Sequence, residues 1–229
     1  MKKRLKINGV IIFFAVLLIA FVPGFFFRKD LENSLDEIAE IFGVTFILLG
    51  QIFRVSSRGH KSEHSLNGSA LVQTGAYSLV RNPMYLGIFL IGLGVVLMLF
   101  NWWAGLIFLV IFYIRYLLLI FKEEKKLRET FRGEYQDYCR KVPRRIFPSL
   151  SDLINREISG YLPIKTLWLL KEIGSILAVL LLTLLIESWR DIRQEGLGLY
   201  LKETSGVFVT VALFICLIVY LGKNNKVNA

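Results

Sequence analysis

The sequence is poor in the residues that build disulfides and metal centres. Its 229 residues include two cysteines, Cys139 in a polar segment and Cys216 in an apolar one. This pair fits neither a disulfide framework nor a cysteine metal site. The two histidines, His60 and His64, have the i, i+4 spacing of metal ligands on a helix, but Gly59 and the nearby serines disfavour a helix there. We therefore expect no metal.

Charge is also scarce over long parts of the chain. The composition is 55% hydrophobic and the mean hydropathy is +0.55, whereas soluble domains are about 45–50% apolar. Five stretches are long and almost free of charge: Val10–Phe27, Met84–Phe100, Trp102–Phe121, Ile173–Ile186 and Gly206–Gly222. A sixth stretch, Ile38–Phe53, is weaker because it carries Glu40 and Gln51.

Stretches of this length predict membrane-spanning helices, since crossing the hydrocarbon takes about 20 residues. Lipid leaves only helices and closed barrels as solutions, and the sequence lacks the alternating ten-residue pattern of barrel strands. The predicted fold class is therefore all-α, a polytopic transmembrane helical bundle of about six spans in a lipid bilayer.

The charge that is present is basic and unevenly placed. The net charge is +10, which in a soluble protein would suggest nucleic acid as a partner. With the N-terminus in the cytoplasm, 21 lysines and arginines fall on the cytoplasmic side and 5 on the opposite side. This asymmetry follows the positive-inside rule. It places both termini in the cytoplasm, turns the basic surface toward anionic lipid headgroups and leaves no need for a nucleic-acid partner.

Three regions follow from the order of polar and apolar segments. Residues 1–56 are predicted to form an N-terminal helical pair, residues 57–148 a core of loop, helical hairpin and basic tail, and residues 149–229 a linker with two further spans. Asn101 alone separates the two spans of the hairpin, so these spans are antiparallel neighbours. Arg81 precedes the first span, and Glu123 and Glu124 follow the second. These residues therefore lie at the same membrane face.

The loop before the hairpin ends in Arg81-Asn82-Pro83. Pro83 pre-sets the first helical turn, and Asn82 is a good N-cap. The exposed amides and the positive helix end would hold an anion such as a carboxylate, and Arg81 adds a fork of donors for the same group. A simple capped helix with an arginine at the cytoplasmic face is the alternative interpretation.

Two carboxylates follow the second span of the hairpin. Glu123 shares an apolar stripe with Leu127, whereas Glu124 lies about 100° round the helix, where Arg128 can pair with it. We therefore predict that Glu123 is turned inward and that Glu124 is solvated. A carboxylate at the membrane edge needs a cationic partner, which is either Arg81 in a plain ion pair or the ammonium group of a ligand.

Arg115 is a charged residue inside the same span. An arginine within a membrane span is a functional-site hypothesis by default, and in that interpretation it lines a cavity. The alternative is that its long side chain reaches the membrane interface.

The loop and the hairpin together resemble a known family. The motif consists of Gly75-Ala76-Tyr77, Arg81-Asn82-Pro83-Met84-Tyr85 with Gly87, and Glu123-Glu124 with Leu127, Phe131, Tyr135, Tyr138, Val142, Arg144 and Pro148. In order and spacing it resembles the membrane methyltransferases related to isoprenylcysteine carboxyl methyltransferase and phospholipid N-methyltransferase, over roughly residues 43–148.

The resemblance implies a cytoplasmic pocket for S-adenosylmethionine, formed by the loop, the hairpin and the tail. By the family pattern, ten residues would line this cofactor: Ser69, Ala70, Leu71, Val72, Tyr77, Asn82, Pro83, Met84, Tyr85 and Glu123. Arg81, Glu123 and Arg115 are the predicted catalytic residues.

Three departures from the family pattern bear on the substrate and the fold. Asn82 stands where the family often has histidine, and Arg132 stands where it has glycine, with Gly133 one place late. Leu119 stands where the prenylcysteine enzymes have a substrate-handling arginine. The last departure weakens the case for a prenylcysteine carboxylate as substrate and favours a neutral or amine-bearing lipid.

The implied reaction moves a methyl group to a lipophilic or membrane-accessible acceptor, and the protein mainly aligns donor and acceptor. Two other functions remain open at this point. A membrane oxidoreductase of the sterol-reductase kind would use NADPH, and a non-catalytic membrane scaffold would bind neither cofactor.

Overall fold

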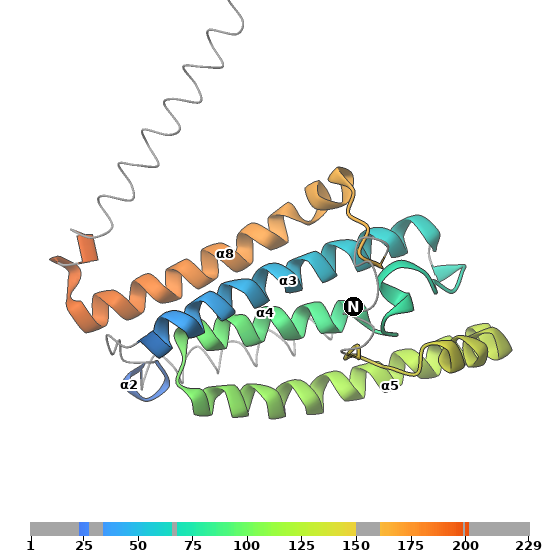
Figure 1. Cartoon of the computed structure of the whole chain (residues 1–229), viewed down its shortest axis with the longest axis horizontal. Coiled ribbons are helices and arrows are strands. Elements are labelled where there is room, and N and C mark those ends of the chain that lie inside the picture. The colour runs from blue at the N-terminus through green and yellow to red at the C-terminus, as the bar shows by residue number, and fades with distance from the viewer. Residues whose placement is uncertain (1–22, 28–33, 66–67, 150–160, 199, 202–229) are drawn as a thin grey trace, which may run out of the picture. The chain divides into compact units, whose positions relative to one another are not determined.

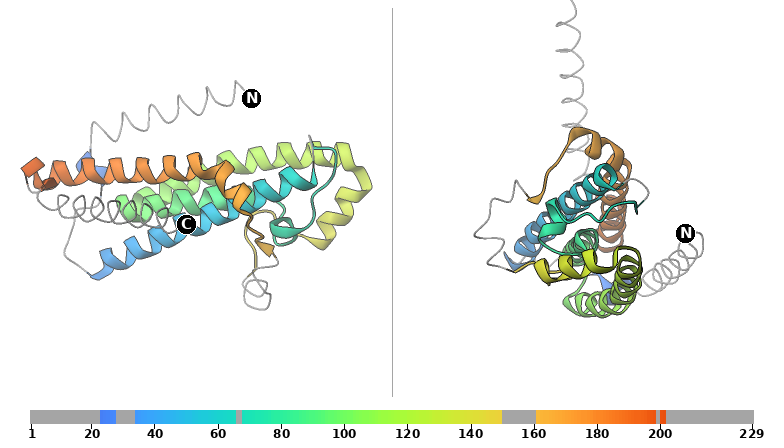
Figure 2. Two further views of the ribbon diagram at one scale, coloured as in Figure 1. Left: turned by 90° about the horizontal axis from the view of Figure 1, so that it is seen from above. Right: turned by 90° about the vertical axis from the view of Figure 1, so that its right-hand side faces the viewer.

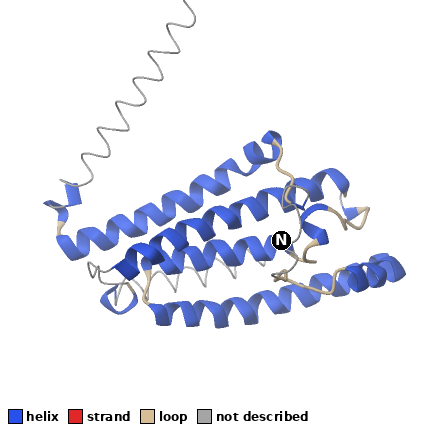
Figure 3. Cartoon of the chain, viewed as in Figure 1, coloured by secondary structure: helices blue, strands red, loops and turns tan. Residues whose placement is uncertain are grey.

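The computed structural model describes residues 23–27, 34–65, 68–149, 161–198 and 200–201, which form helices and loops (Figure 1). The helices are α2 (Pro23–Phe26), α3 (Ser34–His64), the 3-10 helix η2 (Gly75–Ser78), α4 (Pro83–Leu99), α5 (Trp102–Lys141) and α8 (Thr166–Glu195). Figure 3 shows no strand in this part of the chain, where a single backbone bridge joins Phe27 and Phe100. The predicted all-α class is confirmed for these residues.

Three of these helices are long and apolar enough to cross a bilayer, over Ile38–His64, Trp102–Lys141 and Thr166–Arg190. Helix α4 is also apolar but is shorter, with 17 residues. The stretch 206–222 and most of the stretch 10–27 lie outside the described residues. The membrane class of the chain is thus supported by its helices, and the number of six spans stays a prediction.

Helix α3 is longer than the sequence predicted. It runs through Gly59 to His64, where glycine and serine indicated a break, and that expectation is wrong. Side chains in the last turns bond back to the helix, with Ser62 Oγ donating to the Gly59 carbonyl at 2.8 Å and His64 Nδ1 lying 2.9 Å from the His60 carbonyl. Tertiary contacts, such as that of the Trp168 ring on Gly59, override the weak helix propensity.

Helices α3 and α4 lie side by side (Figure 1) and touch through four glycines. A Cβ atom at Gly50 would lie 2.6 Å from the Gly87 carbonyl oxygen, and one at Gly87 would lie 2.7 Å from the Gly50 carbonyl oxygen. Gly43 and Gly94 meet in the same way seven residues along each helix. Contacts between small residues are how membrane helices bring their backbones together. We call these four residues the glycine seam.

Helices α4 and α5 form the predicted antiparallel hairpin. The Asn101 side chain lies in the turn and donates to the backbone oxygens of Phe25 and Phe27 at 3.1 and 3.0 Å. Phe27 stacks on Phe100, with the ring centroids 5.1 Å apart. The turn is therefore held by residues 25–27, which precede α3. At the opposite end of the hairpin, Asn82 before α4 contacts Glu124 in α5.

Helix α5 bends near its C-terminal end, and Figure 2 shows the last turns leaving the line of the helix. The bend lies at Arg132, whose φ of 43° is in the left-handed region. Glycine adopts such a φ at little cost, which gives a physical reason for the glycine of the family pattern. The bend packs Tyr135 and Tyr138 against Leu71 in the loop before α4.

The chain divides into two compact units, residues 1–180 and 181–229. The first unit holds α2 to α5 and the first half of α8. In the second unit, the Tyr200 hydroxyl donates to Ser188 Oγ at 2.7 Å. The predicted regions 1–56, 57–148 and 149–229 have other boundaries than these units, and α3 runs through the predicted boundary at residue 56. The three regions stay a prediction.

Candidate functional site

The loop between α3 and α4 is tied at both ends. The Ser65 hydroxyl donates to the Ala70 carbonyl at 2.6 Å, and Gly75, with a φ of 62°, turns the chain into η2. At the other end, the backbone amides of Arg81 and Asn82 each donate, at 2.9 Å, to the carbonyl oxygens of residues 144 and 145. These two amides therefore bond to the chain itself, and the anion site at the start of α4 stays a prediction.

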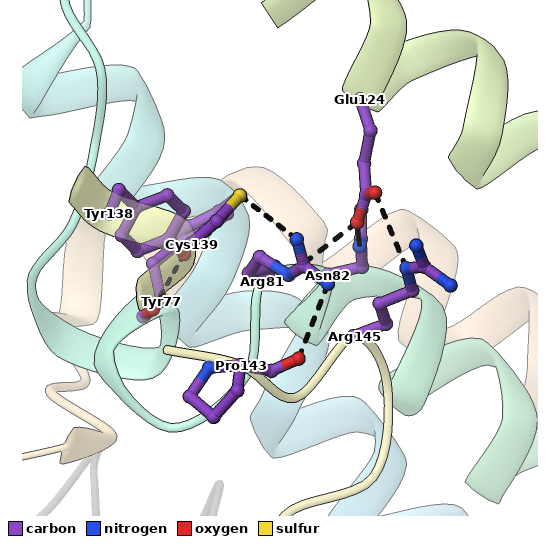
Figure 4. Close-up of polar contacts among 8 residues, drawn as sticks. All are labelled: Tyr77, Arg81, Asn82, Glu124, Tyr138, Cys139, Pro143 and Arg145. Atoms are coloured by element: carbon purple, nitrogen blue, oxygen red, sulfur yellow. Dashed lines mark hydrogen bonds and ion pairs between the residues drawn. The ribbon is translucent and has the colours of Figure 1, made fainter. Parts of the chain in front are cut away.

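A carboxylate lies buried where the loop, α5 and the segment after α5 meet (Figure 4). Glu124 is 4% exposed. Its Oε1 lies 3.6 Å from Arg81 Nε and its Oε2 lies 3.4 Å from Arg145 Nε. The Asn82 side chain donates to Oε1 at 3.4 Å. We call these four residues the Glu124 cluster.

The cluster overturns one sequence prediction, that Glu124 is solvated and pairs with Arg128. Glu124 continues the buried face of α5 that carries Phe112 and Ile120, which are 5% and 0% exposed. The prediction placed Glu123 on an apolar stripe with Leu119, Leu127 and Phe131, of which Leu127 and Phe131 line the polar cavity. Asn82 does take the N-cap position, but its side chain makes no capping bond because it reaches Glu124.

Arg81 is the most connected cation of the site. Its guanidinium also donates to Cys139 Sγ at 2.9 Å and to the Pro143 carbonyl at 3.3 Å. Burial acts to lower the pKa of Arg81, but the adjacent Glu124 carboxylate and the Cys139 sulfur raise it, and the net direction is upward. Arg81 is therefore a fixed positive charge, which also holds the bent end of α5 against the loop.

A cavity of about 520 Å³ lies between the loop and α5, and we call it the polar cavity. Its walls combine charged, hydroxyl and apolar side chains, namely Lys61, Ser65, Gly68, Ala70, Leu71, Val72, Tyr77, Arg81, Glu123, Lys126, Leu127, Thr130, Phe131 and Tyr138. Tyr138 donates to the Tyr77 carbonyl at 2.7 Å. Burial, with a contribution from Glu123, raises the pKa of the Tyr77 phenol, which therefore stays protonated.

The structure brings some of the predicted cofactor residues to this cavity and leaves others apart from it. Ala70, Leu71, Val72, Tyr77 and Glu123 line the cavity, together with the predicted catalytic residue Arg81. The remaining five are not part of its wall: Ser69 is exposed, Asn82 and Pro83 are buried, Met84 is half-buried, and the ring centroids of Tyr85 and Tyr116 are 5.3 Å apart.

A second, larger cavity of about 800 Å³ lies against α4 and α5, and we call it the apolar cavity. Aromatic and aliphatic side chains form most of its wall, which consists of Phe89, Leu109, Val110, Phe112, Tyr113, Ile114, Tyr116, Leu117, Arg144, Arg145, Ile146 and Phe147. Arg145 lies 4.9 Å over the Phe121 ring and also pairs with Glu124. Arg115 is part of neither wall, so the structure does not connect it with either cavity.

Sequence reasoning missed Arg145 and the role of Glu124. The signal for Arg145 was weak, because a basic pair after a helix is common at a cytoplasmic membrane face. Arg145 reaches Glu124 because the segment 144–147 folds back against α4 and α5. Glu124 thus contacts Arg81 on the wall of the polar cavity and Arg145 on the wall of the apolar cavity.

Comparison with known proteins agrees with this geometry. Residues 38–134 match a family described as phospholipid methyltransferase. The chain is 33% identical to a protein-S-isoprenylcysteine O-methyltransferase of Saccharomyces cerevisiae over 114 residues, which are 46% of this chain and 48% of that protein. It is 30% identical to the enzyme of the same name from Schizosaccharomyces pombe over 51% of this chain and 53% of that protein.

A third relative, protein-S-isoprenylcysteine O-methyltransferase B of Arabidopsis thaliana, is 30% identical over 44% of this chain and 56% of its own length. The chain thus spans about half the length of the curated relatives it matches. No solved structure matches it. The resemblance to the membrane methyltransferases of the phospholipid and isoprenylcysteine kinds is confirmed, and it is carried by the helices and the loop that form the polar cavity.

Proposed function

We propose that this chain is an integral membrane methyltransferase that takes the methyl group from S-adenosylmethionine and gives it to a lipophilic acceptor. The observation that carries the proposal is the pairing of two unlike cavities across the Glu124 cluster. The matched family and the names of the relatives support the methyltransferase chemistry, and the apolar helices support the membrane setting.

The walls of the polar cavity fit this cofactor. Glu123 and Arg81 present a carboxylate and a guanidinium, which complement the ammonium and carboxylate groups of an amino acid. Leu71, Val72 and Leu127 add apolar surface for the rest of the molecule, and a volume of about 520 Å³ is in the usual range of about 300–1,000 Å³ for ligand pockets. When bound, the cofactor supplies a methyl group on a sulfonium that needs no further activation.

The residues of the chain then have to align the acceptor and keep water out. The apolar cavity can take a hydrocarbon chain, and Arg144 and Arg145 on its wall suit an anionic group at the end of that chain. For a carboxylate acceptor, the sulfur–carbon bond breaks and an oxygen–carbon bond forms, which leaves a neutral ester and requires no general base.

We therefore propose a carboxylate on a lipophilic chain as the acceptor, as the names of the relatives would suggest. An amine-bearing phospholipid is the second candidate, because Leu119 replaces the substrate-handling arginine of the prenylcysteine enzymes. We prefer the carboxylate because Arg144 and Arg145, which line the apolar cavity, can supply the positive charge that Leu119 lacks.

Methyl transfer in the purified membrane-embedded chain tests the proposal. Labelled S-adenosylmethionine is offered with a farnesylated cysteine analogue and, separately, with a phospholipid extract, and we expect the label on the farnesylated compound. Label on phospholipid alone selects the amine acceptor. Binding of NADPH in place of S-adenosylmethionine selects the oxidoreductase, and binding of neither cofactor selects the scaffold.

We also propose that the polar cavity faces the cytoplasm, as the positive-inside asymmetry predicts. Lys125 and Trp102 stand near the two ends of the span in α5 and are exposed, so they offer a matched pair of labelling sites. In a cysteine-free background, a cysteine at position 125 should react with an impermeant reagent from the cytoplasmic side only, and one at position 102 from the other side only. The reverse pattern would contradict the proposed orientation.

A further inference from the structure

Helix α8 lies beyond the residues that match the family, yet its first turns are fixed to the end of α3. Trp168 is 2% exposed, and its indole N–H donates to Glu63 Oε1 at 2.7 Å. Lys165 Nζ pairs with the other oxygen of Glu63 at 2.6 Å. One turn further, Glu172 pairs with Arg58 at 2.8 Å. Glu172 also lies 3.8 Å from Arg54, so the start of α8 is held to α3 by three ion pairs and the indole hydrogen bond.

The Trp168 ring lies directly on the α3 backbone at Gly59. A Cβ atom at Gly59 would overlap the indole carbons, so only glycine leaves room for the ring. The same indole meets the neighbouring His60 ring edge-on, with centroids 6.3 Å apart and an interplanar angle of 81°. His60 is 7% exposed; its ring stacks on His64, with centroids 4.0 Å apart, and Trp168 of α8 covers it from another direction.

The other side of His60 contacts the loop of the polar cavity. His60 Nε2 lies 2.8 Å from Thr74 Oγ1 in a hydrogen bond. At Gly75, where φ is 62°, a Cβ atom would lie only 3.1 Å from the His60 ring. The ring thus sets the distance between α3 and the start of η2, which carries Tyr77 into the wall of the polar cavity.

We infer that Trp168 and His60 are positioning residues for the donor, acting through Thr74 on the loop that forms the polar cavity. The inference rests on the proposed function, since it assigns the donor to that cavity. Neither Trp168 nor His60 lines the cavity, so they act on its shape and not on the ligand. This gives the first half of α8 a role in donor affinity, although it lies outside the matched residues.

The test compares donor affinity, turnover and loop exchange in four variants. Trp168→Ala and Thr74→Val should each raise the KM for S-adenosylmethionine about tenfold, with kcat at saturating donor within about twofold, because the reacting groups are unchanged. Thr74→Ser keeps the hydroxyl and should restore the KM. Trp102→Ala removes an indole that is 77% exposed and should change neither value.

Hydrogen exchange of the peptide that covers residues 68–81 provides a readout that needs no donor. Trp168→Ala and Thr74→Val should accelerate exchange there, whereas Trp102→Ala should not. Unchanged exchange, or equal KM values for Thr74→Val and Thr74→Ser, would overturn the inference even if Trp168→Ala fails to fold. If the unaltered chain binds no donor, the proposed function fails, and the exchange result still decides whether α8 holds the loop.

Discussion

The two cavities of this protein share helix α5 but differ in the parts of the chain that build their other walls. The polar cavity is formed with the loop between α3 and α4, inside the residues that match the family. The apolar cavity is formed with α4 and with residues 144–147, which follow the matched range. The family match therefore covers the loop that lines the polar cavity, which we propose for the donor, but not residues 144–147 of the apolar cavity, which we propose for the acceptor.

The Glu124 cluster is the contact common to both walls, so breaking it should have the largest effect. Glu124→Gln leaves Arg81, whose side chain is 9% exposed, without its charged partner, and loss of one partner of a buried pair costs about 3–5 kcal/mol. We expect the free energy of unfolding in detergent to fall by that amount. Glu129→Gln is the matched control, because its pair with Lys125 is exposed at 4.0 Å and should contribute less than about 1 kcal/mol. Equal losses would show that Glu124 is not the structural link.

Glu123 lines the polar cavity but is not part of the Glu124 cluster, so a variant at Glu123 tests ligand binding apart from stability. Glu123→Gln should weaken S-adenosylmethionine binding by about 1.5–3 kcal/mol, the range for a hydrogen bond to a charged group, with little change in unfolding. Isothermal titration on the two glutamine variants checks this. Weaker donor binding in folded Glu124→Gln than in Glu123→Gln would contradict the assignment of Glu123 to the donor.

The glycine seam joins α3, which contributes Lys61 to the polar cavity, to α4, which contributes Phe89 to the apolar cavity. Gly50→Ala places a Cβ atom 2.6 Å from the Gly87 carbonyl oxygen, and overpacking of this kind costs about 1–3 kcal/mol. We expect a lower unfolding temperature. Gly174→Ala is the control, because no atom lies within 4 Å of its added Cβ. A stable Gly50→Ala protein would show that the helices are not in close contact.

The smallest effect is expected at Arg132 in the bend of α5, because its side chain lines neither cavity. Arg132 has a φ of 43°, and a non-glycine residue in that region costs roughly 1 kcal/mol or more. Arg132→Gly should therefore raise the free energy of unfolding by about 1 kcal/mol. Gly133→Ala, at the adjacent position, is the comparison variant and should not be stabilising for this reason. A destabilised Arg132→Gly protein would show that the arginine side chain contributes more than the backbone strain costs.

The sequence supported the elements more reliably than their contacts. Apolar length predicted the helices around Arg81 and Glu123, and the short turn at Asn101 predicted their hairpin. Pattern counting could not decide between Glu123 and Glu124, because the face that is buried changes where α5 leaves α4 and meets the loop. It also could not find the glycine seam, since spacing by seven residues acquires meaning only when the facing helix is known.

The family motif likewise gave part of the site. Five of the ten residues it implied for the cofactor line the polar cavity, and this assignment to a cofactor stays a prediction. Arg145 and Trp168 were beyond reach, because each becomes significant only through a distant segment that folds back. The sequence showed that Arg132 replaces the glycine of the motif. The structure shows that this position has a positive φ, which glycine adopts more easily than arginine.

One measurement tests most directly whether the donor binds in the polar cavity and the acceptor in the apolar cavity. Leu109→Trp should fill part of the apolar cavity, and Glu123→Gln should weaken the polar one. Steady-state kinetics with S-adenosylmethionine and a farnesylated cysteine analogue should show a KM for the acceptor raised about tenfold in Leu109→Trp alone, and a KM for the donor raised in Glu123→Gln alone. If each variant raised both KM values equally, or if Leu109→Trp changed only the donor KM, the assignment of donor and acceptor to separate cavities would be contradicted.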